Sequence, residues 1–130
     1  MKGDGKVIEA LNGLLAYEMA ASDQYFIHAR VYEDLGLHRL KARIQHEHQE
    51  ELEHAQRLID RILFLEGTPD LGKRVGVGTS REVPEMLTKD LEMEREVVGE
   101  LRRAIRLCEE AGDYQTRHVL RELLADTEED

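Results

Sequence analysis

Residues 67–81 read GTPDLGKRVGVGTSR, and this glycine-rich stretch separates two long segments of helical periodicity from two more. The stretch is too long for a tight turn between neighbouring antiparallel helices. We therefore predict a crossover that runs the length of a helical bundle.

Two predicted helices precede the crossover. The first covers residues 4–35, where apolar side chains recur at helical spacing, and Gly36 ends it. The second covers residues 37–66 and is ended by Gly67 and Pro69.

Two further helices follow the crossover. The third covers residues 82–111, with Thr79 or Ser80 as its N-cap, and the fourth covers residues 113–130, with Asp113 as its cap. The apolar stripe of the third helix consists of Val83, Leu87, Leu91, Val97, Val98, Leu101 and Ile105. The sequence thus predicts an all-α, single-domain chain over residues 1–130: a four-helix bundle with one long crossover between the second and third helices.

Composition excludes several classes of protein. The chain has 130 residues, which suits one domain, and a net charge of −10, which argues against nucleic acid as a partner. Cys108 is the single cysteine, so no disulfide framework forms within the chain. The sequence shows no apolar run of membrane-spanning length and no signal-peptide core, so we expect a cytoplasmic protein without membrane contact.

The fourth predicted helix is the shortest and ends in TEED. Acidic residues at a helix C-terminus oppose the helix dipole, and no Gly or Asn caps this end. We infer that the natural chain continues past Asp130 or that its ordered part stops there.

Ionisable residues fall inside the apolar stripes of all four helices, where a solvated surface is not expected: Glu18, Glu51, His54, Glu94 and Glu128. Ionised carboxylates buried together repel one another, and bound cations reverse this effect. A set rich in carboxylate oxygen with one imidazole per metal suits iron or manganese better than structural zinc. The stripes therefore predict a two-metal site inside the bundle.

The helical spacing of Glu51 and His54 lets both side chains reach one metal ion. A single Glu-x-x-His pair is common on solvated helices, and His46 and His48 on the same charged helix are expected to face solvent or a cavity. The agreement among four helices favours the metal site. Glu128 begins a second pair, whose His would follow Asp130.

Several stretches resemble bacterioferritin, a ferritin-like family, over the whole chain. They are MKGDGKVIEALN (residues 1–12), DQYFIHARVYEDLGLHRL (23–40), RILFLEGTPDL (61–71), EMLTKDLEMERE (85–96) and LADTEED (124–130). The resemblance implies a homo-oligomeric, hollow shell of twenty-four subunits built from dimers. It also implies ferroxidase activity, in which oxygen or peroxide oxidises Fe(II) at a di-iron site and the ferric mineral is stored.

The resemblance also assigns roles to residues. Glu18 and His54 would bind one iron, Glu94 and the absent His would bind the other, and Glu51 and Glu128 would bridge them. Tyr25 would lie beside this site.

Further roles follow for the second helix. His46 and Glu50 match an accessory iron position on the inner surface, and Glu47 lies near the route of iron to the site. The family binds haem b between paired subunits through a Met, but Leu52 occupies that position and cannot ligate haem iron.

Two functions other than a catalytic ferroxidase stay open. The first rival is a non-catalytic or partly catalytic subunit that co-assembles with a haem-binding bacterioferritin chain. The second rival is another ferritin-like enzyme, such as a small peroxidase or a mini-ferritin, although mini-ferritin sites lie between subunits.

Overall fold

The computed structural model describes residues 2–129, which form four helices. They are α1 (Gly5–Asp34), α2 (His38–Phe64), α3 (Val83–Ala111) and α4 (Tyr114–Glu129). No strand occurs within this described range, so the all-α prediction is confirmed. The predicted bounds differ from these by at most two residues, and the predicted end of the fourth helix at residue 130 lies outside the described residues.

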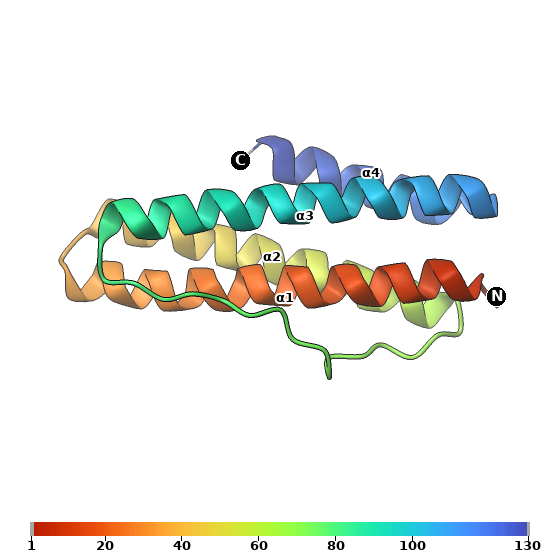
Figure 1. Ribbon diagram of the computed structural model, residues 1–130, viewed down its shortest axis with the longest axis horizontal. Helices are drawn as coiled ribbons and strands as arrows, with labels where there is room; N and C mark the ends of the chain where they lie inside the picture. The colour runs from red at the N-terminus through yellow and green to blue at the C-terminus, as the bar shows by residue number, and fades with distance from the viewer. Residues whose placement is uncertain (1, 130) are drawn as a thin grey trace.

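The connection between α2 and α3 runs along the outside of α1 from one end of the bundle to the other (Figure 1). As a result α2 and α3 point in the same direction, while α1 and α4 run antiparallel to them. This is the arrangement that the glycine-rich stretch predicts, and it brings the middle of α1 beside the middles of both α2 and α3.

The helix ends show which residues stop each helix. Gly36 and Gly112 adopt left-handed backbone conformations after α1 and α3, with φ of 74° and 71°. After α2, however, Glu66 takes the left-handed conformation, with φ of 63°, rather than Gly67. Gly67 instead permits a close approach to α1, because a Cβ atom there would lie 2.7 Å from Ile8 Cγ2.

Side-chain caps begin two of the helices. Asp4 accepts from the backbone of Lys6 at 2.8 Å, and Asp113 accepts from that of Thr116 at 3.0 Å, as expected for the fourth helix. The N-cap of α3 is Glu82, so the prediction of Thr79 or Ser80 is wrong. The hydroxyl of Ser80 accepts instead from the backbone nitrogen of Glu82 at 3.0 Å, in the turn that precedes the helix.

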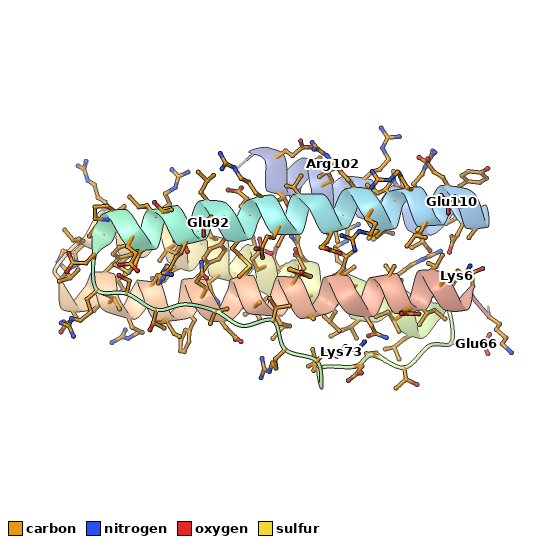
Figure 2. All side chains as sticks on the ribbon, viewed as in Figure 1. Lys6, Glu66, Lys73, Glu92, Arg102 and Glu110 are labelled. Carbon is orange, nitrogen blue, oxygen red and sulfur yellow. The ribbon has the colours of Figure 1, made fainter. Side chains whose placement is uncertain are left out.

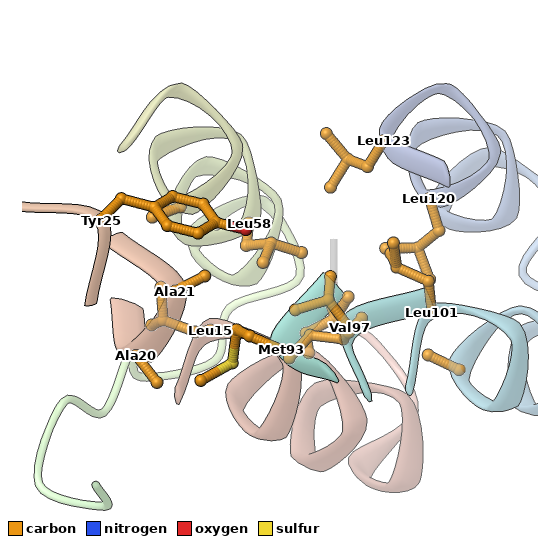
Figure 3. Packing of buried hydrophobic residues seen from close by; sticks show 14 of the residues in the cluster. Leu15, Ala20, Ala21, Tyr25, Leu58, Met93, Val97, Leu101, Leu120 and Leu123 are labelled. Atoms are coloured by element: carbon orange, nitrogen blue, oxygen red, sulfur yellow. The ribbon is translucent and has the colours of Figure 1, made fainter. Parts of the chain in front are cut away.

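The core lies between α1, α2 and α3, and α4 closes only part of it. Figure 3 shows Leu120 and Leu123 of α4 reaching toward Val97 and Leu101 of α3. In Figure 1, α4 covers the C-terminal half of α3 and leaves its N-terminal half uncovered.

The uncovered half of α3 corrects part of its predicted stripe. Leu87 and Leu91 are exposed, whereas Met86 and Met93 point into the core. The error arises because apolar residues occupy two neighbouring faces of α3, and the helix directs the face with Met86 and Met93 toward α1.

Charged side chains surround the bundle on its outer faces (Figure 2). Glu92, Arg102 and Glu110 project from α3, and Lys73 projects from the crossover. Among the described residues, no helix combines the length and the apolar character that a membrane span requires.

Candidate metal centre

Glu18, Glu51 and His54 meet between α1 and α2. Glu18 lies midway along α1 and is 0% exposed, while Glu51 and His54, one turn apart on α2, are 4% and 3% exposed. Burial of two carboxylates and an imidazole in a core is costly unless they are paired or bind a cation. The predicted convergence of these three side chains is therefore present in the fold.

The distances suit a shared metal ion. His54 Nδ1 lies 2.9 Å from Glu18 Oε2 and 3.8 Å from Glu51 Oε2. One ligand atom from each residue lies within 4.8 Å of the others, and no other group of this kind is found in the described part of the chain. Ligands of one ion at about 2.0–2.2 Å have similar mutual separations, so small side-chain adjustments suffice for coordination.

One oxygen of each carboxyl group lacks a partner, whereas Glu18 Oε2 lies within hydrogen-bond distance of His54 Nδ1. Glu18 Oε1 and Glu51 Oε2 are buried without a hydrogen-bond partner. Burial raises the pKa of Glu18 well above its usual value. Burial, followed by the charge of Glu18, raises the pKa of Glu51. The pair thus retains protons near neutrality unless a cation replaces them.

Asp126 of α4 completes the surroundings of His54, and the sequence analysis missed it. Its Oδ2 atom lies 3.3 Å from His54 Nε2. When Nε2 carries the imidazole proton, it donates to Asp126, and the Nδ1 lone pair faces Glu18 and Glu51. Partners of this kind fix the orientation of metal-binding histidines.

The position of Asp126 follows from the true inner face of α4, which carries Thr116, Leu120, Leu123 and Thr127. Glu128, which the sequence analysis placed within the apolar stripe of the fourth helix, lies beside this face. Thr116 and Thr127 were the available signal, since threonines at helical spacing from Leu120 and Leu123 continue one face. The predicted inner face of α4 is shifted by one residue from the observed one, and this shift explains why Asp126 was not predicted.

Glu94 and Glu128 lie outside the group of three. Glu94 lines a pocket of about 170 Å³ together with Tyr25, Glu47 and Asp90. Glu128 is half exposed, and its Oε2 accepts a hydrogen bond from Arg102 Nη2 at 2.9 Å. The structure thus brings three of the five predicted ligands together.

The predicted accessory residues lie on α2. His46 is 71% exposed on its side chain, and its Nε2 lies 3.4 Å from Glu50 Oε1. Glu47 faces the pocket that contains Glu94 rather than this surface pair. Leu52, at the position of the haem-ligating Met in the resembled family, is half-buried.

Residues 8–130 match the family model described as ferritin-like domain. The chain belongs to this family. Proteins similar to this ferritin-like chain include the bacterial ferritin of Synechocystis sp., 52% identical over 130 residues, which covers 100% of the chain and 83% of the relative. The bacterial ferritin of Pseudomonas aeruginosa is 49% identical over 100% of the chain and 84% of its own length.

A more distant relative is the bacterioferritin of Brucella melitensis, 39% identical over 98% of the chain and 80% of its own length. Similarity over the whole described bundle agrees with the resemblance noted in the sequence. Membership of the ferritin-like family, together with a candidate metal site inside the bundle, supports iron storage as the function.

Proposed function

We propose that this chain is a ferroxidase that oxidises Fe(II) inside the bundle and stores the ferric product in a shell. The observation that carries the proposal is the buried group of Glu18, Glu51 and His54, in which Glu18 Oε1 and Glu51 Oε2 lack hydrogen-bond partners. Oxygen-rich ligands with one imidazole suit iron, and the family supports that choice. Bound iron supplies the electrons that reduce oxygen or peroxide.

The residues have distinct parts in this proposal. Glu18 and His54 hold one Fe(II) ion, and Glu51 bridges it to a second ion held by Glu94. Because the raised pKa values keep the pair of Glu18 and Glu51 partly protonated before iron binds, metal entry releases protons from the pair. His46, Glu47 and Glu50 are proposed to guide or hold additional iron on the way to the mineral.

Glu128 is proposed as the second bridging ligand. To reach the centre, its carboxylate has to leave Arg102. An ion pair between half-exposed side chains contributes only about 0–1 kcal/mol, so iron can displace the arginine at little cost.

Tyr25 keeps its proton beside this site. Burial raises the pKa of its phenol, and the nearby charge of Glu51 raises it further. The hydroxyl is therefore a hydrogen-bond donor at every working pH and can orient a neighbouring carboxylate.

The shell is proposed from the family and from the surface. Phe26 on α1, Leu63 and Phe64 on α2, and Tyr114 on α4 are each more than half exposed. Exposed aromatic and leucine side chains are a feature of association surfaces. An assembly of twenty-four subunits built from dimers is the proposed form, and co-assembly with a haem-binding chain stays a prediction that native mass spectrometry tests.

Stopped-flow absorbance after mixing the protein with Fe(II) and oxygen tests the function. The variant Glu51→Ala removes the bridging carboxylate, and we expect it to slow the fast oxidation phase at least about 100-fold. The matched control is Glu110→Ala, which removes an exposed glutamate far along α3. A fast phase that survives in Glu51→Ala contradicts the assignment, and its loss in both variants shows a nonspecific effect.

A further inference from the structure

A second buried polar cluster joins α1 to α3 outside the group of three ligands. Its centre is the Oδ1 atom of Asp90 on α3, which lies 2.8 Å from His28 Nδ1 and accepts a hydrogen bond from Gln24 Nε2 at 2.8 Å. Gln24 and His28 come from successive turns of α1 and are 3% and 0% exposed. Neither the proposed metal ligands nor the core packing explains why these polar side chains are buried.

The cluster is costly to keep. Both ring nitrogens of His28, Asp90 Oδ2 and the hydroxyl of the adjacent Tyr32 are buried without hydrogen-bond partners, although His28 Nδ1 lies at ion-pair distance from Asp90. A protein is often as stable with apolar residues of similar volume as with a buried polar group. The best-attested role of buried polar groups is to fix the register of packed helices. A register function is therefore the physical reason that fits this cluster.

The register of α3 against α1 determines the position of Glu94 along the bundle. Asp90 and Glu94 are one helical turn apart on α3, and α3 runs antiparallel to α1 (Figure 1). Glu94 therefore lies one turn closer than Asp90 to the level of Glu18 on α1. A slip of one residue moves a helix by about 1.5 Å along its axis, whereas metal ligands must be placed within about 0.5 Å.

We propose that Gln24, His28 and Asp90 are positioning residues that lock α3 onto α1 so that Glu94 faces the group formed by Glu18, Glu51 and His54. The inference rests on the proposed function, because it assigns Glu94 to the second metal ion. The proposed ligands of the first ion, Glu18, Glu51 and His54, come from α1 and α2, so its binding does not need the cluster. The cluster thus acts on one of the two metal positions and spares the other.

The test is a titration of the whole chain with Co(II), followed by the absorption bands of the bound ion. The variant Gln24→Met/His28→Leu removes both contacts to Asp90 and keeps its charge. We expect the affinity for the second Co(II) to fall about tenfold, as for other residues that orient ligands, while the affinity for the first stays within about threefold. If the double variant does not fold, Gln24→Met alone serves, since it breaks the 2.8 Å hydrogen bond with little change in volume.

Two further variants separate positioning from simple electrostatics. Asp90→Asn removes the charge but keeps an oxygen that accepts from Gln24, so positioning predicts second-ion affinity within about threefold of the unaltered chain. On a Glu94→Ala background, Gln24→Met/His28→Leu should cause no further loss, because its effect passes through Glu94. Gln45→Met, an exposed position on α2, is the matched control and should change neither affinity.

Three results overturn the proposal. They are an equal loss at both metal positions in Gln24→Met/His28→Leu, a loss in Asp90→Asn as large as in that variant, and additive losses on the Glu94→Ala background. Failure of the proposed function has a different signature: the unaltered chain then binds no Co(II), and the inference falls with it.

Discussion

On α1 and α2, the side chains of the proposed ligands Glu18, Glu51 and His54 are at most 6% exposed and lie against one another. The Glu128 side chain of α4, in contrast, is 48% exposed and pairs with Arg102. The difference follows the packing. α1 and α2 lie against each other along their whole lengths, while α4 meets only part of α3 (Figure 1). In the proposed centre, Glu18, Glu51 and His54 thus form a half that the core preforms, and the half that contains Glu128 would have to be assembled when metal binds.

Removing one ligand from each half tests this difference between the halves with the largest expected effect. We expect His54→Ala to weaken binding of the first Co(II) about 100-fold, because it removes a preformed ligand and opens a void beside two carboxylates. Glu128→Ala should weaken first-ion binding less than about threefold, since that side chain is directed to Arg102. Isothermal titration calorimetry gives both affinities, and equal losses would show that the two halves are formed together.

The same contrast explains how much the sequence could reveal. The four helices and the crossover followed from long apolar stripes and a glycine-rich stretch, which act locally. Glu18, Glu51 and His54 were predictable because two helices that pack fully leave a single orientation for their stripes. Asp126 and the surface pair of Glu128 were missed, since the inner face of α4 continues through the buried Thr116 and Thr127, which a stripe drawn through apolar residues leaves out.

Residues that join distant parts of the chain were also out of reach. The role of Gly67 depends on Ile8 of α1, and Asp90 gains its meaning only from Gln24 and His28. A polar residue such as Asp90 within a charged helix has the same local pattern whether it is solvated or buried. Tertiary packing alone decides between these two states.

The pH dependence of stability tests the preformed half separately, because Glu18 and Glu51 are its titrating groups. The pKa values of Glu18 and Glu51 are raised, so the folded metal-free chain holds protons that the unfolded chain releases above about pH 4.5. Stability of the metal-free protein should therefore fall as pH rises from 4.5 through the raised pKa values, by up to about 1.4 kcal/mol per pH unit for each retained proton. Affinity for Co(II) should rise over the same interval, because fewer protons have to leave.

Thermal unfolding of the metal-free protein at pH 6 and pH 8 measures the first effect. The variant Glu51→Gln is the control, because it cannot ionise, and its stability should change less with pH than that of the unaltered chain. A metal-free protein that gains stability between pH 6 and pH 8 would show that the two carboxyl groups are already ionised and paired in the fold.

The smallest expected effect comes from the contact that keeps the second half apart. Arg102→Gln removes the partner of Glu128 without removing the carboxylate, so that carboxylate is free to turn toward the metals. Because both side chains are half exposed, the pair contributes only about 0–1 kcal/mol, and second-ion affinity should rise no more than about threefold. The gain should shrink as salt is added, since salt weakens the ion pair in the unaltered chain too.

The matched control is Arg103→Gln, because Arg103 follows Arg102 in the sequence and pairs with Glu100 instead. A rise with Arg103→Gln as large as with Arg102→Gln would trace the effect to net charge, and a fall with Arg102→Gln would mean that the arginine holds α4 where Glu128 can bind.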